Sequence, residues 1–149
     1  MIDAQEKVRF HFLTEGFSLR NRGRLKQFLM ELCRKEGQKV EAINYIFCDD
    51  QYLLQINKTY LKHDTYTDIV TFQLSGKGEP LLADIYISIE RVKENAGNFR
   101  VSFRSELHRV IFHGALHLCG YKDKNKAQAA EMRRRENECL EKYFSSTES

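Results

Sequence analysis

The sequence has the length and composition of one folded domain. It contains 149 residues, of which 42% are hydrophobic and 30% charged, and its eight glycines and one proline are too few for a collagen-like or disordered chain. A chain of this size can bury one hydrophobic core without disulfides or a structural metal. We therefore expect a single domain over residues 1–149, with a frayed tail at about 144–149.

The distribution of apolar residues argues against a membrane protein, and the N-terminal sequence argues against a secreted one. No apolar run approaches the roughly 20 residues that cross a bilayer. The N-terminus also lacks the basic and apolar segments of a secretory signal. We therefore expect a cytoplasmic protein with no membrane partner. The cysteines show no C-x-x-C pair and are interpreted mainly as reduced core residues: Cys33, Cys48, Cys119 and Cys139.

The net charge of +3 is too small to require a nucleic-acid partner. Its distribution is more informative, because residues 20–39 and 122–135 each carry a local excess of lysine and arginine. Such stretches are common on solvated helix faces, so they permit phosphate binding without demonstrating it.

Hydrophobic spacing predicts the elements in chain order. Alternating or β-branched segments predict strands at 8–12, 41–48, 67–74 and 81–89. Three- and four-residue spacing predicts helices at 22–36, after a cap at Asp49 or Asp50, at 89–98, from a Ser102 cap to 118, and from an Asn125 cap over 126–143.

The order of these elements indicates the fold class. Residues 75–80 form a turn between two adjacent strands, which we expect to be antiparallel. The order β-α-β-α-β-β-α-α-α then indicates an α+β fold. We expect a small mixed β-sheet of about four strands packed with about five helices.

The segment from Phe112 to Asp123 carries the strongest chemical signal. His113 and His117 are four residues apart on a predicted helix, so their imidazoles lie on one face and can share a metal ion. Gly120 lets the backbone turn, which allows Asp123 to return as a third ligand. Two histidines and one carboxylate leave room for water, as in catalytic zinc sites. The alternative is a chance pair on a polar helix face.

Three neighbouring residues limit the chemistry. Zincin proteases carry a glutamate directly after the first histidine, but Gly114 stands there and cannot accept a proton. Glu106, on nearly the same helix face, could orient a ligand from behind or simply face solvent. Cys119 points about 200° away from His117 on the helix and is better explained by packing.

Three motifs resemble those of one family. HGALHLCGYKD at 113–123 is similar to the H-G-x-L-H-L-x-G-Y-D-H motif of the YbeY family of bacterial metal-dependent endoribonucleases. Asn57, Tyr60 and TDIVTF at 67–72 are similar to its N-x-x-[FY]-R and P-T-[DN]-V-L-S-F motifs, and ADIYIS at 83–88 to its G-D-I-x-I-S strand. The resemblance covers about residues 40–140 in family order.

The resemblance implies a function and a site. It implies a single-strand endoribonuclease, with one Zn²⁺ or another divalent transition metal per chain, that acts on ribosomal RNA. The implied process is small-subunit 3′-end maturation and ribosome quality control, with ribosomal RNA and the ribosomal subunit as partners, and ribosomal proteins or assembly GTPases as further partners. The metal would sit at the C-terminal end of a core helix, with His113, His117 and Asp123 acting through the ion and its water.

Two positions depart from the family pattern. Asp123 falls where the family has its third histidine, so the ligand role passes to a carboxylate, whose charge should make bound water less acidic. Leu61 stands where the family usually has an arginine that contacts RNA phosphate, and leucine cannot do this. Lys62 and His63 are the nearest substitutes.

Other residues are candidates for RNA contacts. Aromatic rings beside polar loops can stack on unpaired bases, whereas Phe72 is better explained by core packing. Basic side chains can neutralise phosphates. The RNA-binding candidates are Arg22, Arg24, Lys62, His63, Tyr66, Tyr121, Lys122 and Lys124.

Two other functions remain open from the sequence. A metalloprotease-like hydrolase would use the same ion, although Gly114 argues against it. A non-catalytic ribosome-assembly factor with a structural metal is favoured by the departures at Leu61 and Asp123.

Overall fold

The computed structural model describes residues 7–61 and 67–145, and confirms the predicted α+β class. Within these residues, four strands form one mixed sheet, and five α-helices pack with it. The strands are β1 (Val8–Phe12), β2 (Val40–Cys48), β3 (Ile69–Gln73) and β4 (Leu81–Ser88). The helices are α2 (Arg22–Lys35), α3 (Asp50–Ile56), α4 (Ile89–Phe99), α5 (Phe103–Leu118) and α6 (Lys126–Ser145).

The sheet has the order β1-β2-β4-β3. β1 and β4 both run parallel to β2, while β3 runs antiparallel to β4, as predicted for the strands around residues 75–80. β3 is therefore an edge strand. Its open edge leaves room for a cleft beside the helix that carries the histidines.

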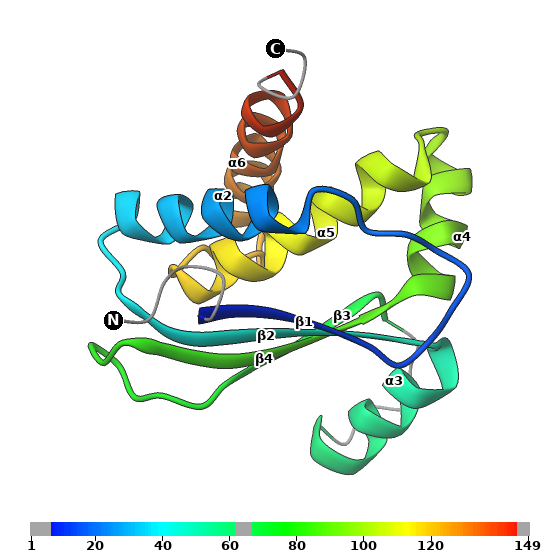
Figure 1. Cartoon of the computed structure of the whole chain (residues 1–149), viewed down its shortest axis with the longest axis horizontal. Coiled ribbons are helices and arrows are strands. Elements are labelled where there is room, and N and C mark those ends of the chain that lie inside the picture. The colour runs from blue at the N-terminus through cyan, green and yellow to red at the C-terminus, as the bar shows by residue number, and fades with distance from the viewer. Residues whose placement is uncertain (1–6, 62–66, 146–149) are drawn as a thin grey trace.

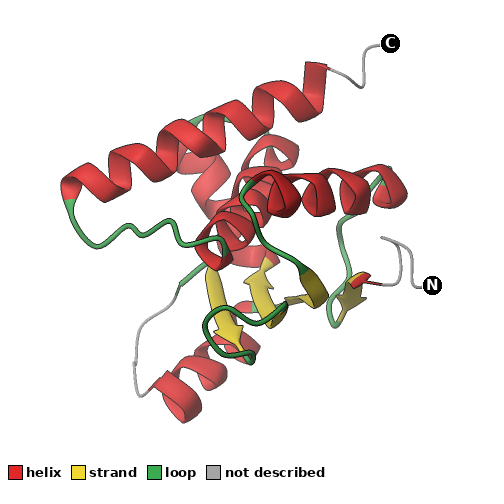
Figure 2. Ribbon diagram, turned by 90° about the vertical axis from the view of Figure 1, so that its left-hand side faces the viewer, coloured by secondary structure: helices red, strands yellow, loops and turns green. Residues whose placement is uncertain are grey.

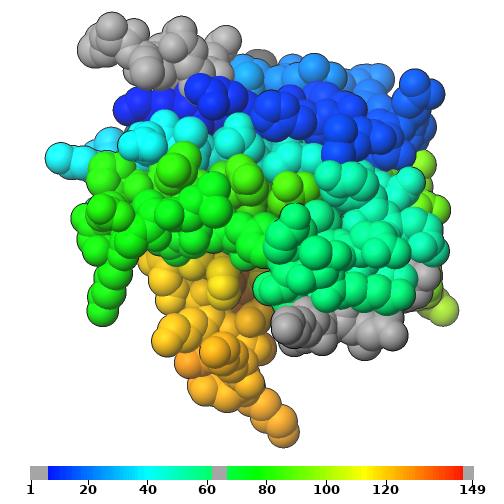
Figure 3. Space-filling model, turned by 90° about the horizontal axis from the view of Figure 1, so that it is seen from below, coloured from blue at the N-terminus to red at the C-terminus, as the bar shows by residue number. Residues whose placement is uncertain are grey.

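The helices are arranged in layers around this sheet. Figure 1 shows α2 and α5 over one face of the sheet, with α6 beyond them. Figure 2 shows the same layers from the side, with α3 on the opposite side of the sheet at one end. In the view from below, residues of β2 and β4 are visible beside α3 (Figure 3). The main core lies between the sheet and α5, and includes Tyr45, Phe47 and Phe112.

The predicted helix caps are present. The side chain of Asp49 accepts a hydrogen bond from the backbone N–H of Tyr52, Ser102 accepts one from Ser105, and Asn125 accepts one from Gln128. Gly120, just after α5, has a φ of 103°, a left-handed conformation that glycine adopts without strain. The chain can therefore turn directly after His117.

Two expected boundaries were wrong. The helix predicted to carry Tyr60 on its buried stripe ends at Ile56 and continues as a π-helical turn, η1 (Asn57–Leu61). The wider turn buries Asn57 and leaves Tyr60 65% exposed. At the C-terminus, α6 reaches Ser145 because Tyr143 is buried and Phe144 packs on the core, so the first two residues of the expected frayed tail are helical.

The cysteines have the packing role expected of them. Cys33, Cys48 and Cys139 are buried and Cys119 is half-buried, all as free thiols. The Cys119 Sγ lies 3.9 Å from the Cys33 Sγ. Cys119 therefore packs towards α2.

His108 gives the fold a pH dependence of its own. It is buried, its ring stacks on Tyr143 with centroids 5.3 Å apart, and its Nδ1 donates to the carbonyl of Arg104. Burial lowers the pKa of His108 below its ordinary value of 6.5. The unfolded chain therefore binds a proton more readily, and the free energy of unfolding should fall as pH drops through about 6.5.

We expect His108→Asn to flatten this dependence. Asparagine can keep the hydrogen bond to the Arg104 carbonyl but does not titrate, so the variant should lose a slope of up to about 1.4 kcal/mol per pH unit. Urea denaturation of both proteins between pH 7.5 and 5.5 measures the slope. Parallel curves would show that His108 does not titrate on unfolding.

The described part of the chain contains no helix long and apolar enough to span a membrane.

Candidate functional site

Helix α5 and the loop after it bring together the three predicted metal ligands. His113 and His117 lie on the same face of α5, and the loop after Gly120 returns Asp123 towards them. The His113 Nε2 is 3.5 Å from the Asp123 Oδ2. All three side chains line one cleft of about 500 Å³ along β3.

His113 is held by a residue that sequence reasoning missed. Its Nδ1 lies 2.7 Å from the Glu136 Oε2, and Glu136 also accepts a hydrogen bond from the Arg109 Nη1. Because a carboxylate only accepts, Nδ1 carries the proton and Nε2 turns towards Asp123. Glu136 is buried in a stripe of α6 that otherwise carries Met132, Cys139 and Tyr143. A glutamate in an apolar stripe was the available signal.

The charges around His113 act in opposite directions. Burial lowers the pKa of His113, but the hydrogen bond and charge of Glu136, with Asp123 and Asp68, raise it overall. For Glu136, burial raises the pKa, while His113 and Arg109 lower it overall. Glu136 is therefore favoured as a carboxylate, the form that orients the imidazole.

His117 is oriented by the backbone. Its Nδ1 is 3.1 Å from the carbonyl oxygen of Tyr121. A carbonyl oxygen only accepts, so this nitrogen donates. In both histidines Nδ1 is thus engaged by an acceptor of the protein, which leaves Nε2 as the nitrogen that could bind a metal ion.

The donor atoms of these three side chains are of the types that bind a transition metal. Two imidazole nitrogens and a carboxylate oxygen are the usual ligands of catalytic zinc. In residues 7–61 and 67–145, no group of three or more His, Cys, Asp or Glu side chains forms a ready-made metal site. The Asp123 side chain is 46% exposed on its loop, against 24% for that of His113.

Asp68 is a further acidic residue of this cleft. It lies just before β3 and lines the cleft with His113 and Asp123. Burial raises its pKa, while the charge of His113 lowers it. The Asn95 side chain donates to the Asp68 Oδ2 at 3.4 Å. In the sequence Asp68 stands out only as part of the TDIVTF motif, with no predicted role of its own.

Glu106 does not contact the histidines. It is buried, and its Oε1 lies 4.0 Å from the Arg109 Nε. The partner of His113 is Glu136 on α6 instead. Glu106 faces a recess beside the cleft, together with His113 and Asp123.

The predicted RNA contacts are distributed unevenly. Lys122 and Lys124 are exposed on the loop that carries Asp123. Arg22 and Arg24 lie on α2 and donate to the carbonyls of Leu19 and Tyr143, and neither lines the cleft. Three of the predicted contacts fall outside the described residues: Lys62, His63 and Tyr66.

Tyr121 is engaged within the protein. Its hydroxyl donates to the Glu36 Oε1 and accepts from the Arg135 Nε, both at 3.1 Å. Arg135 also donates to Glu36, so these three side chains tie the Asp123 loop to α2 and α6. This arrangement makes Tyr121 an anchor of the loop, whereas the sequence analysis proposed stacking on RNA.

Leu61 lines the cleft and is 41% exposed. Its side chain gives the cleft an apolar surface at the position where the family usually has an arginine that contacts phosphate. Phe72, on β3, is half-buried against a small apolar cluster, in agreement with the expected packing role.

Gly114 permits close packing of α5 on the sheet. A Cβ at this position would lie 3.1 Å from the Cδ1 atoms of Ile69 and Ile85. We expect Gly114→Ala to press on these two isoleucine side chains. The cost of overpacking, about 1–3 kcal/mol, should outweigh the gain of about 1 kcal/mol in helix propensity, so the free energy of unfolding should fall. Urea denaturation measures the change.

Gly97→Ala is the matched control for this prediction. Gly97 lies in α4, and a Cβ there would meet nothing within 4 Å. Alanine should stabilise that helix by about 1 kcal/mol. Equal effects of the two substitutions would show that contact with the isoleucines is not the cause.

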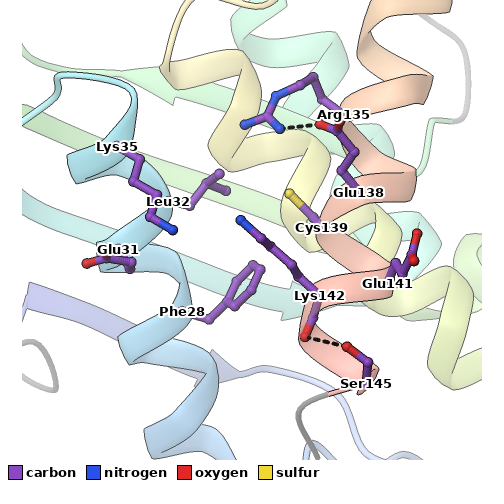
Figure 4. A pocket seen from close by; sticks show the side chains of 10 residues that line it. All are labelled: Phe28, Glu31, Leu32, Lys35, Arg135, Glu138, Cys139, Glu141, Lys142 and Ser145. Carbon is purple, nitrogen blue, oxygen red and sulfur yellow. Dashed lines mark hydrogen bonds and ion pairs between the residues drawn. The ribbon is translucent and has the colours of Figure 1, made fainter.

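Another pocket lies away from the histidines, between α2 and α6 (Figure 4). Phe28 and Leu32 line it from α2, and Cys139 from α6. Its charged lining is balanced, because three basic residues meet three glutamates: Lys35, Arg135 and Lys142, and Glu31, Glu138 and Glu141. This pocket shares no residue with the cleft.

Together, the mixed sheet and the cleft at its β3 edge define a small α+β enzyme-like domain. A family model described as "Endoribonuclease YbeY" matches residues 15–144. The chain belongs to this family, which confirms the resemblance found in the sequence.

Individual relatives agree over most of the chain. Proteins named endoribonuclease YbeY from Flavobacterium psychrophilum and Flavobacterium johnsoniae are each 48% identical; they cover 85% and 88% of this chain, and the matches span 90% and 93% of their own lengths. The solution structure of TM1509 from Thermotoga maritima matches with a TM-score of 0.65 and 30% identity, over 93% of this chain and 91% of that one. The fold and the family are thus supported independently.

Proposed function

We propose that this protein is a zinc-dependent endoribonuclease that cuts single-stranded RNA during ribosomal RNA maturation. Membership of a family of endoribonucleases supports RNA cleavage and a role in rRNA processing. The observation that carries the metal assignment is the convergence of His113, His117 and Asp123 on one cleft. We extend the proposal to the 3′ end of small-subunit rRNA and to ribosome quality control, in the cytoplasm.

The proposed ligands are the Nε2 atoms of the two histidines and a carboxylate oxygen of Asp123. A bound divalent ion would polarise a phosphodiester oxygen and promote attack by water. Glu136 fixes the ring of His113, and the Tyr121 carbonyl fixes that of His117. These contacts fix the direction in which both Nε2 atoms point, which reduces the ordering cost of binding an ion.

The rest of the cleft suits a single strand. Lys122 and Lys124 flank Asp123 and can neutralise phosphates near the reacting bond. Leu61 and the residues at the start of β3 form a wall with neutral side chains. The names of the relatives favour RNA over peptide as substrate, and Gly114 offers no general base for a zincin protease.

The test is cleavage of an end-labelled single-stranded oligoribonucleotide. We expect internal cuts that disappear after treatment with a chelator and return when one equivalent of Zn²⁺ is added. A quenched peptide under the same conditions should stay intact. RNA binding without cleavage at full metal occupancy would favour the non-catalytic assembly factor, and cleavage unaffected by complete metal removal would overturn the metal assignment.

A further inference from the structure

A recess adjoins the cleft at His113 and Asp123, beneath α4 and α6. Its volume is about 310 Å³. This is at the lower end of the range for small-molecule sites, about 300–1,000 Å³. It also shares Asp68 and Ile69 with the cleft, so a strand lying across His113 can place one substituent in it.

The recess contains a buried carboxyl group, that of Glu106, whose side-chain partner among the described residues is a long ion pair with Arg109. The Glu106 side chain is only 5% exposed, and within the described chain its nearest cationic atom is the Arg109 Nε, 4.0 Å away. The terminal nitrogens of Arg109 donate to Glu136 and Asn137 instead. Burial raises the pKa of Glu106, which reflects the lost solvation. A buried acceptor in this state gains from a ligand that brings N–H donors.

The walls of the recess suit a flat heterocycle. Ile69, Val110 and Met132 give apolar surface. Phe99, which also lines the recess, is 55% exposed, so its ring is open to stacking. Asn95 adds an amide to the lining, with both donor and acceptor atoms.

An arginine side chain also lines the recess. Arg133 lines it, and its side chain is 53% exposed. Its Nη1 lies 3.7 Å from the Glu136 Oε1. A guanidinium in this position can contact a phosphate of a strand that enters the recess. The recess thus combines an apolar wall with a strongly acidic polar lining, in which Asp68, Asp123 and Glu136 join Glu106. Such a lining favours the donor groups of a base, and Arg133 is the exposed cation available to its phosphate.

We propose that this recess binds the base of one nucleotide next to the cleaved bond, and that Glu106 selects bases with an exocyclic amino group over uracil. Adenine, cytosine and guanine can donate an exocyclic amino N–H to the carboxylate. Uracil carries O4 in place of that amino group and has a single donor on this edge, N3–H between two carbonyl oxygens that a carboxylate repels. This inference rests on the proposed function, because it concerns the RNA that the cleft would cut.

The first experiment reads the bases around each cut. A random-sequence single-stranded RNA is cleaved by wild type, Glu106→Gln and the control Glu94→Gln, and the products are sequenced. At one position beside the cut we expect uracil to be disfavoured about 10-fold by wild type and by Glu94→Gln, because one good side-chain contact to a base gives discrimination of that order. Glutamine can donate as well as accept, so Glu106→Gln should reduce the preference to about 2-fold or less.

The second experiment does not depend on cleavage. NMR titration of the metal-free protein with the four nucleoside 5′-monophosphates should show weaker binding of UMP, and Glu106→Gln should remove the difference. Phe99→Ala, at an exposed position, should weaken all four without changing their order. A wild-type protein that binds or cuts all four bases equally, or a Glu106→Gln variant that keeps the full preference, overturns the inference. Selective binding without RNA cleavage would instead support the base site and contradict the proposed nuclease.

Discussion

His117→Ala is expected to reduce RNA cleavage on the order of 1,000-fold. A metal ion that stabilises charge in the transition state contributes several kcal/mol, and each 1.36 kcal/mol is a factor of ten in rate. His117 is exposed, and its one described polar contact is to the Tyr121 carbonyl, so the fold should tolerate alanine. Single-turnover cleavage and elemental analysis of the same preparation measure rate and metal content together.

His11→Ala is the matched control for this prediction. His11 is another exposed histidine, on β1, and its Nε2 lies 3.1 Å from the Asn44 Oδ1 on the strand beside it. It should keep wild-type metal content and wild-type rate. If His117→Ala keeps both as well, the proposed metal centre is wrong. If it keeps the metal but loses the rate, His117 acts on the substrate and not as a ligand.

Glu136→Gln should give the second largest effect. It removes the charge that holds the His113 ring while nearly preserving shape, and the loss of such an orienting partner typically costs 10–100-fold in metal affinity or activity. Glu136 also accepts from Arg109, so the free energy of unfolding should drop by about 1–3 kcal/mol. Competition with a chromophoric chelator measures the affinity for zinc, and urea denaturation measures stability.

Glu138→Gln separates the two effects of that substitution. Glu138 lies on the same helix but is 46% exposed, and it pairs with Arg134 and Arg135 rather than with a histidine. The affinity of the Glu138→Gln variant for zinc should stay within about 2-fold of wild type, because exposed ion pairs contribute little to stability. Unchanged zinc affinity in Glu136→Gln would show that Glu136 has only a structural role.

Local sequence signals located most elements because their causes are local. The caps at Asp49, Ser102 and Asn125 satisfy backbone N–H groups within the same helix, and the turn at Gly120 depends on one residue's conformation. The helix ending at Ile56 was harder to predict. Its π-helical extension buries Asn57, and such a change in winding is decided by contacts outside the segment.

The same distinction between local and distant contacts explains which residues of the site could be predicted. The histidine pair is visible because helical spacing alone aligns His113 with His117. Glu136 was missed because it lies 23 residues after His113 and meets it only when α6 packs on α5. Tyr121 was placed on the RNA because its neighbours in sequence are polar, whereas Glu36 and Arg135 reach it from two other helices.

By itself, the sequence determined the α+β class, the helix carrying two histidines on one face, and the turn that follows it. Each of these depends on the conformational preferences of neighbouring residues. Only the tertiary structure decided which carboxylate orients His113, and that Glu106 is buried with a long ion pair to Arg109. Both depend on the packing of α4, α5 and α6, which desolvates some charges and pairs others across long sequence separations.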